Sequence, residues 1–292
     1  MTPRSEMVRY YPTVISSAKR RFDEPTILFR ADPNTEDELE VAQRYFPVER
    51  QRAQCYDSLV IGRYSMLPFY REVCNDLKVN SCAPVNSYKQ HKWISSFDYY
   101  VDLVDFTPTT WDDYTLNTAE WDGPFVVKGE TTSKKFEWNT LMFAEDKTHA
   151  LEIASKLLRD GELRGQKLIY RKYVKLKTFE IGLNGLPFTN EWRFFFYKDQ
   201  QLALGYYWSC ANDLTKPYMT IKGTKFANEV AKVVSMHVPF FCLDIAETEE
   251  GEWILIEVND AQQSGLQEVD PDVLYQSLQK ALTNERKQSK RM

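Results

Sequence analysis

Three oxygen-bearing side chains lie on two apolar segments near the end of the chain, "FFCLDIAE" (240–247) and "WILIEVND" (253–260). The short "EEGE" stretch between them predicts a turn that folds the second segment back along the first. Such a hairpin brings Asp244 close to Glu257, and strand alternation places Asn259 on the same face as Glu257. Carboxylate and amide oxygens suit Mg²⁺, which usually shares its coordination sphere with nucleotide phosphates. The alternative is that these polar residues simply end two strands.

Asp260 follows Asn259 directly, so strand alternation turns its side chain to the opposite face. We therefore expect Asp260 to organise the loop that follows rather than to bind a metal.

Basic residues that could meet a phosphate occur earlier in the chain. Lys128 follows "PFVV" on a predicted strand, where it is either an edge residue or a charge directed into a cleft. The next stretch, "TTSKKFEW" (131–138), could hold phosphate oxygens through its backbone amides and through Ser133, Lys134 and Lys135. The sequence contains neither a GxxxxGK[ST] nor a GxGxxG motif, so this loop is neither a P-loop nor a Rossmann fingerprint.

Arg193 lies among aromatic residues in "NEWRFFFY", on a segment predicted to be a central strand. A buried arginine needs an anion, which is either Glu191 on the same strand face or a ligand. The guanidinium fork fits carboxylate and phosphate oxygens with two parallel hydrogen bonds.

The elements that must position these residues fall into three parts. Apolar runs at 26–31 and 57–65, each followed by helical spacing, predict an α/β layer over residues 25–110, with Thr35 and Glu38 forming a capping box. The Thr-, Asp- and Pro-rich stretch that follows marks a boundary, so we expect an N-terminal domain over residues 1–112.

A compact α+β unit is expected over residues 113–175, and a C-terminal unit over 176–292. The first would contain strands at 124–130, 137–144 and 167–176 and a helix at 146–160 opened by Asp146. The second would contain an antiparallel sheet of "FEIGLN", "NEWRFFFYKD" and "QLALGYYWS", a helix near 222–236, the hairpin, and a last helix that begins with proline at "PDVLYQSLQKAL".

Composition narrows the class of protein. The 292 residues are 43% hydrophobic and 27% charged, which is typical of a globular protein. The net charge of −5 argues against broad binding to nucleic acid, although "AKRRF" (18–22) and "ERKQSKRM" (285–292) are local basic patches. Five scattered cysteines predict reduced thiols, and the absence of a signal-peptide pattern or a long apolar run predicts a cytoplasmic protein with no membrane partner.

The stretches "PFVVKG", "NEWRFFFY" and "FFCLDIAETEEGEWILIEVNDAQQSGL" resemble the ATP-grasp superfamily, closely over residues 115–270. Within it, "VKGETTSKKFEW" and "EWRFFF" resemble most the clade named for one arginine and two lysines (the R-two-K clade), which is found often in phages and bacteria. The resemblance implies an α+β and α/β ATP-grasp fold, with an N-terminal pre-ATP-grasp layer and two α+β subdomains enclosing ATP. It identifies the arginine as Arg193 and the lysines as Lys128 and Lys135.

The resemblance also assigns roles to residues. Lys128 would contact the α- and β-phosphates, the loop of Ser133, Lys134 and Lys135 would cover the phosphates, and Asp244, Glu257 and Asn259 would bind one or two Mg²⁺ ions. Arg193 would steady the transferring phosphoryl group or the acyl phosphate. The hinge would offer backbone groups to adenine, and Glu180 is the candidate for the ribose contact. The hinge residues are Tyr170, Arg171, Lys172, Tyr173 and Val174.

Two departures from the pattern affect this assignment. The loop "ETTSKKF" stands where many ATP-grasp enzymes have a glycine-rich loop, and Arg171 and Lys172 stand where many have an acidic hinge residue.

Three functions follow as hypotheses. The first is an ATP- and Mg²⁺-dependent ligase that activates a carboxylate as acyl phosphate and joins it to an amine, on a peptide, an amino acid or a macromolecule. The second is a phosphotransferase or end-joining enzyme acting on nucleic acid, suggested by the basic tail and the aromatic stretch "YSMLPFYREV". The third is an ATP-binding module without turnover. By position, Arg63, Tyr64, Ser65 and Ser264 are candidates for the acceptor pocket.

Overall fold

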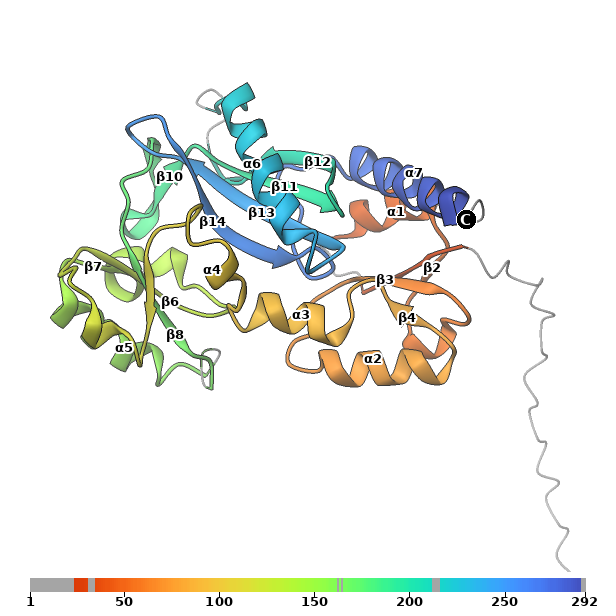
Figure 1. Cartoon of the computed structure of the whole chain (residues 1–292), viewed down its shortest axis with the longest axis horizontal. Coiled ribbons are helices and arrows are strands. Elements are labelled where there is room, and N and C mark those ends of the chain that lie inside the picture. The colour runs from red at the N-terminus through yellow and green to blue at the C-terminus, as the bar shows by residue number, and fades with distance from the viewer. Residues whose placement is uncertain (1–23, 31–34, 162, 164, 212–215, 290–292) are drawn as a thin grey trace, which may run out of the picture.

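The computed structural model of the chain describes residues 24–30, 35–161, 163, 165–211 and 216–289. These residues form three units, each built on a four-stranded sheet. Figure 1 shows the C-terminal sheet in the middle, with the central unit at one end and the N-terminal layer at the other. The basic stretch 18–22 lies outside the described residues.

The N-terminal layer is a parallel sheet in the order β2-β1-β3-β4, as the strand and helix pattern predicted. Its elements are β1 (Thr26–Phe29), α1 (Glu36–Tyr45), β2 (Val48–Glu49), η1 (Arg52–Gln54), β3 (Leu59–Arg63), α2 (Tyr70–Val79) and β4 (Ala83–Pro84). Helix α1 begins after Thr35 as expected, but the predicted capping box is wrong. The carboxylate of Glu38 instead accepts hydrogen bonds from Arg63 and Tyr275, because its side chain is buried against them.

The central unit is an antiparallel sheet in the order β5-β8-β6-β7. The chain reaches it through α3 (Tyr88–Ser95) and α4 (Tyr99–Asp102), and its own elements are β5 (Thr110–Asp112), η2 (Leu116–Thr118), β6 (Phe125–Gly129), η3 (Lys135–Glu137), η4 (Trp138–Met142), β7 (Phe143–Ala144), α5 (Lys147–Leu157) and β8 (Leu168–Lys172). Asp146 caps α5, as predicted, by accepting a hydrogen bond from the backbone of His149 at 2.8 Å.

The strand predicted at 137–144 is mostly wrong. Residues Trp138–Met142 form a π-helical turn, and only Phe143–Ala144 pair with β6. The turn places the Trp138 ring beside the rings of Phe143 and Tyr173, with centroids 6.1 and 6.4 Å away. A short apolar run does not distinguish a strand from a helical turn, so packing against these rings decides the conformation.

The C-terminal sheet is antiparallel in the order β12-β11-β13-β14. The elements of this unit are β9 (Thr178–Ile181), η5 (Leu183–Gly185), β10 (Pro187–Thr189), β11 (Glu191–Tyr197), β12 (Gln200–Tyr206), α6 (Ile221–Val234), β13 (Phe240–Glu247), β14 (Trp253–Asp260) and α7 (Pro271–Ser289). The hairpin and the proline-led last helix are confirmed. The segment "FEIGLN", however, does not join this sheet, because β9 pairs with β10 in a separate two-stranded ribbon.

The two faces of the C-terminal sheet have different neighbours. Phe194, Phe196 and Leu243 pack with α6 in one core cluster. Phe195 and Cys242 face the other way and pack with α1, α7 and the N-terminal layer. This second face also carries the polar residues of the hairpin, since Cys242 is the register partner of Asn259.

None of the helices formed by the described residues combines the length and apolar character that a membrane span needs.

Candidate active site

Strands β11, β13 and β14 place Arg193, Asp244 and Glu257 in one row, because Arg193 is the register partner of Asp244 and Asp244 that of Glu257. The Arg193 guanidinium donates from Nε and Nη2 to the two carboxylate oxygens of Asp244 at 2.8 and 2.7 Å, and from Nη1 to the carbonyl of Gly265 at 2.7 Å. The anion that pairs with the buried arginine is therefore Asp244, not Glu191. Such a two-point charged contact is among the stronger hydrogen-bonding arrangements in proteins.

The hairpin brings the three predicted metal ligands together. The amide nitrogen of Asn259 donates to Asp244 Oδ2 at 3.1 Å and to Glu257 Oε2 at 3.2 Å. Asp260 instead accepts a hydrogen bond at 3.0 Å from the backbone N–H of Gln262, so it organises the following loop as expected.

Lys128 reaches this cluster from the central unit. Its ammonium group forms an ion pair with Glu257, and only 9% of the residue is exposed. Burial by itself would raise the pKa of the Glu257 carboxyl, but the charge of Lys128 and the hydrogen bonds from Lys128 and Asn259 hold it below its ordinary value. Lys128 thus links the sheet of the central unit to the metal-ligand strand of the C-terminal unit.

The two loop lysines point to different partners. Lys135 Nζ donates to the Tyr207 hydroxyl at 3.1 Å and lies 5.4 Å from the centre of the Trp208 ring. Burial lowers the pKa of Lys135, although the charge of Glu191 acts in the opposite direction. Lys134 Nζ instead lies 2.9 Å from a carboxylate oxygen of Asp160.

A cleft of about 910 Å³ opens between the central and C-terminal units. Of the residues predicted to contact nucleotide or metal, those that line it are Lys128, Ser133, Lys135, Arg171, Lys172, Tyr173, Val174, Asp244 and Glu257. Apolar walls come from Val126, Met142, Leu186, Ile254 and Ile256 among others. An apolar cleft with a few convergent charged groups is the usual form of a small-molecule site.

Some predicted contacts lie outside the cleft lining. Tyr170 is buried in the core of the central unit and donates to Asp113 at 2.7 Å. Lys134 is paired with Asp160, and Glu180 lies exposed on β9. Asn259 lines a second pocket on the other side of the hairpin cluster.

The sequence matches the model of the ATP-grasp domain of the R-two-K clade, family 3, over residues 117–278, which is more than half of the chain. The chain belongs to the R-two-K clade of the ATP-grasp superfamily. The matched segment contains Lys128, Lys135 and Arg193 together with the three residues of the hairpin cluster. No curated protein is a significant match to the chain.

Solved structures with the ATP-grasp fold cover nearly the whole chain. D-cycloserine synthetase DcsG is 13% identical with a TM-score of 0.58, covering 88% of this chain and 99% of its own. D-alanine–D-alanine ligase from Bacillus anthracis, complexed with ATP, is 10% identical with a TM-score of 0.57, covering 90% and 98%. The ATP-grasp ligase PsnB, complexed with minimal precursor, Mg and ADP, is 13% identical with a TM-score of 0.51, covering 91% and 99%. The chain thus shares the fold of these ATP-grasp structures over most of its length.

The ATP-grasp cleft contains a carboxyl group that the sequence did not mark as a site residue. Glu191 lines the cleft, accepts a hydrogen bond from Thr189 Oγ1 at 3.3 Å, and is 6% exposed. Burial raises the pKa of Glu191 to about 8, and the neighbouring charge of Asp244 adds to this effect. The available signal was its position two residues before Arg193, which puts both side chains on one strand face.

The side chain of Arg171 was also missed, because only its backbone was expected to matter. Its guanidinium donates to Thr110 Oγ1 at 3.2 Å and to the carbonyl of Ile256, next to Glu257. Its Nη2 atom is buried without a hydrogen-bond partner among the described residues. Arg171 therefore fastens the hinge strand β8 to the strand that carries the predicted metal ligands.

The hairpin cluster suits the divalent cation that an ATP-grasp site uses. Within the described part of the chain, no three His, Cys, Asp or Glu side chains are grouped to hold a metal ion. Asp244, Glu257 and Asn259 bring two carboxylates and one amide oxygen to the same place, where the Asn259 amide nitrogen donates to both carboxylates at 3.1 and 3.2 Å. These donors are of the kind that hard cations prefer, and Arg193 and Lys128 balance the two negative charges.

Proposed function

We propose that this ATP-grasp protein is an ATP- and Mg²⁺-dependent ligase that activates a carboxylate as an acyl phosphate and joins it to an amine. The observation that carries the proposal is the row of Arg193, Asp244 and Glu257, which Lys128 meets from the opposite unit across the edge of the cleft. Phosphoryl transfer depends mainly on positioning and on neutralising negative charge, and this arrangement brings cations and metal-ligand oxygens to one place.

The residues divide the work between nucleotide and metal. ATP would lie in the cleft, with Tyr173 and Val174 at the adenine end and with Lys128 and Lys135 at the phosphates. Asp244, Glu257 and Asn259 would hold Mg²⁺, which supplies neutralisation of phosphate charge when bound. Lys128 would exchange its contact with Glu257 for the phosphates, and Arg193 keeps Asp244 oriented through two hydrogen bonds.

The proposed reaction proceeds in two balanced steps. A carboxylate oxygen attacks the γ-phosphorus, the bond to the β-phosphate oxygen breaks, and ADP leaves. The amine nitrogen then forms a bond to the acyl carbon, the bond from that carbon to the phosphate oxygen breaks, and inorganic phosphate leaves. Starting from an ammonium substrate, one proton is released overall. The carboxylate substrates to be tested are peptides, amino acids and modified macromolecules.

The test is release of ADP and phosphate with panels of carboxylates, using hydroxylamine as a general nucleophile that converts an acyl phosphate into a hydroxamate. Glu257→Gln removes one charged metal ligand and the partner of Lys128, so turnover is expected to fall by about 100-fold or more. Glu252 lies on the same hairpin, is exposed and forms an ion pair with Lys222. Glu252→Gln is therefore the matched control, and its turnover is expected to be unchanged.

Two results would overturn the proposal. Release of AMP and pyrophosphate would exclude an acyl phosphate. A wild-type protein that binds ATP but releases no ADP with any carboxylate would be a binding module, and Glu257→Gln would then change only its nucleotide affinity.

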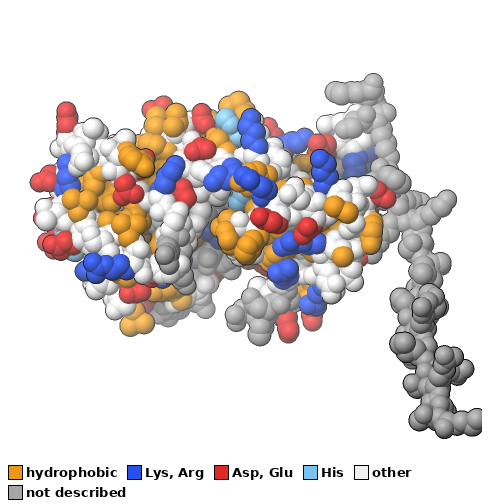
Figure 2. All heavy atoms as spheres, turned by 90° about the horizontal axis from the view of Figure 1, so that it is seen from below, with side chains coloured by type: hydrophobic (Ala, Val, Ile, Leu, Met, Phe, Trp, Pro, Cys, Tyr) orange, Lys and Arg blue, Asp and Glu red, His pale blue; other side chains and the backbone are white. Residues whose placement is uncertain are grey.

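The nucleic-acid alternative gains no support from the structure. On the face drawn in Figure 2, Lys and Arg side chains are interspersed with Asp and Glu side chains rather than forming a continuous basic surface. In the tail, Glu285 engages Lys198 and Tyr197, and residues 290–292 lie outside the described part.

A further inference from the structure

A second pocket of about 690 Å³ lies on the other side of the hairpin cluster from the cleft. It is bordered by Val258, Asn259 and Asp260 of β14, so it adjoins the proposed metal ligands directly. The N-terminal layer, helix α3, the central unit and the loop after β14 contribute the rest of its wall. These residues are Ser65, Leu67, His91, Ile94, Ser95, Glu130, Thr131 and Thr132, with Gln263 and Ser264 from the loop after β14. Two of the residues predicted to form the acceptor pocket, Ser65 and Ser264, are among them.

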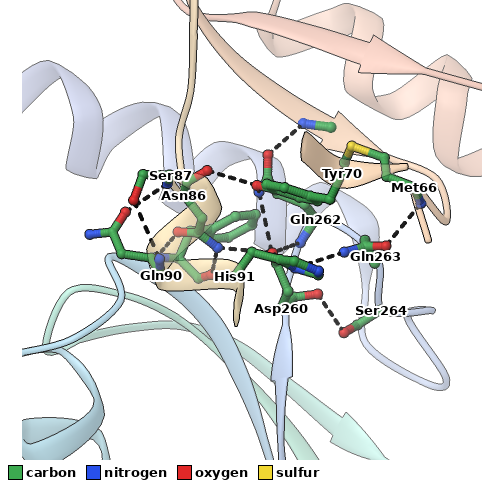
Figure 3. A network of polar contacts seen from close by, with 12 residues as sticks. Met66, Tyr70, Asn86, Ser87, Gln90, His91, Asp260, Gln262, Gln263 and Ser264 are labelled. Carbon is green, nitrogen blue, oxygen red and sulfur yellow. Dashed lines mark hydrogen bonds and ion pairs between the residues drawn. The ribbon is translucent and has the colours of Figure 1, made fainter. Parts of the chain in front are cut away.

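Two carboxylates line this pocket, and the first is already saturated. Asp260 Oδ1 accepts from Asn86 Nδ2 at 2.8 Å and from Gln262 at 3.0 Å, and Oδ2 lies 3.0 Å from His91 Nδ1. Figure 3 shows these side chains converging on Asp260 from α3, from the preceding segment and from the loop after β14. Asp260 therefore joins the N-terminal layer to the end of β14 and has little capacity left for a ligand.

The second carboxylate is not saturated. Glu130 follows the last residue of β6, and its Oε2 atom is buried without a hydrogen-bond partner among the described residues. Burial raises the pKa of Glu130, although the charges of the exposed Lys167 and Lys92 lower it. A buried carboxylate oxygen without a partner is costly, and a ligand that donates a hydrogen bond removes that cost.

The two cavities differ in the charges that line them, because the cleft has four cationic side chains beside three carboxylates whereas the second pocket has two carboxylates and no described lysine or arginine. Lys128, Lys135, Arg171 and Lys172 line the cleft, as expected for phosphate and carboxylate groups. The described residues that line the second pocket include no lysine or arginine, and His91 there is already held by Asp260. An anion in this pocket would face two carboxylates, whereas an ammonium group would meet a hydrogen-bond acceptor that lacks a donor.

We propose that the second pocket binds the amine substrate as its ammonium form and that Glu130 is the residue that recognises it. This assignment rests on the proposed ligase function and names the class of nucleophile: a cationic amine without a carboxylate beside the reacting nitrogen. The acyl group arrives from the cleft side of the cluster, and the amine from the Glu130 side.

The first test measures binding without turnover. The protein is saturated with Mg²⁺ and a non-hydrolysable ATP analogue, and saturation-transfer NMR compares amino-acid amides, which carry an ammonium and no carboxylate, with N-acetyl amino acids, which carry the reverse. Some amides are expected to bind. Glu130→Gln is expected to lower their affinity about tenfold or more, which is the usual effect of losing a hydrogen bond to a charged group. Ser65→Trp should fill the pocket and abolish binding, whereas Glu145→Gln, exposed in the same unit as Glu130, should leave it unchanged.

The second test separates this proposal from the ligase function. Hydroxylamine is uncharged near neutral pH, so Glu130→Gln should raise the KM of a cationic amine without raising that of hydroxylamine. The assignment of the pocket would be overturned by any of three results. These are equal effects of Glu130→Gln on both nucleophiles, binding of the N-acetyl amino acids in this pocket, and failure of every amide to bind. Amide binding that depends on Glu130, in a protein that never releases ADP, would instead leave the pocket standing and remove the ligase function.

Discussion

The substitution Glu38→Gln tests how the N-terminal layer is fixed to the catalytic unit. Glu38 Oε1 accepts hydrogen bonds from Arg63 Nε at 2.8 Å and from the Tyr275 hydroxyl at 2.7 Å. Arg63 also donates to the carbonyl of Ala261, immediately after β14. Although burial alone lowers the pKa of the Arg63 guanidinium, the charge of Glu38 raises it above its ordinary value. The guanidinium therefore stays charged, and a glutamine at position 38 would leave that charge buried without an anion.

The magnitude follows from comparing two ion pairs of equal length. Arg63–Glu38 and Arg52–Asp76 are both 2.8 Å long, but the side chains of the first pair are 4% and 9% exposed and those of the second 24% and 55%. Removing one partner of a buried pair costs about 3 to 5 kcal/mol. Removing one partner of an exposed pair costs less than about 1 kcal/mol. Asp76→Asn is therefore the matched control.

The assay is urea unfolding followed by circular dichroism, with the free energy of unfolding extrapolated to zero denaturant for both variants. A loss in Glu38→Gln that is no larger than the loss in Asp76→Asn would refute the argument. It would mean that solvent or a rearranged side chain neutralises Arg63, and that the contact with Ala261 does not depend on the ion pair.

Two further predictions concern β11 and β12. Glu191 retains its proton up to about pH 8 in the folded protein but loses it near pH 4.5 when unfolded, so the folded state binds more protons between these values. The free energy of unfolding in EDTA should therefore fall as pH rises through this range, and Glu191→Gln should flatten the slope; an unchanged slope would contradict the assignment. Gly205→Ala would put a Cβ 2.3 Å from the backbone nitrogen of Val269, at a cost of about 1 to 3 kcal/mol in urea unfolding. At Gly161 an added Cβ would meet no heavy atom of the described residues within 4 Å apart from its chain neighbours, so Gly161→Ala should change stability by less than about 0.5 kcal/mol. Equal effects of the two substitutions would show that the β12 contact can yield.

Patterns that act within a few residues made much of the fold predictable. The period of two in "WILIEVND" and a short turn sufficed to place Asp244 opposite Glu257, and the register confirms it. The cap at Asp146 and the proline at the start of α7 are likewise local signals.

Contacts between distant segments were not predictable in the same way. Arg193 meets Asp244 because β11 inserts next to β13, a pairing across 51 residues that alternation along either strand does not reveal. Glu130 was predicted as the last residue of a strand at 124–130, and that pattern does not reveal that one of its carboxylate oxygens is buried without a partner among the described residues. The π-helical turn at Trp138 was missed because its conformation depends on rings at positions 143 and 173.

Glu257 and Asn259 are neighbours on one face of strand β14, but they line different cavities. Glu257 lines the cleft, and Asn259 lines the second pocket. Residues 257 and 259, two positions apart on a strand, are separated by about 7 Å, roughly the length of two amino acids in an extended peptide. An acyl phosphate made on one side would thus be within reach of an amine on the other without leaving the protein. Capture by the bound amine would then compete with hydrolysis inside one complex. The partition between amide and hydrolysed product should follow occupancy of the second pocket and should stop changing once the amine saturates it.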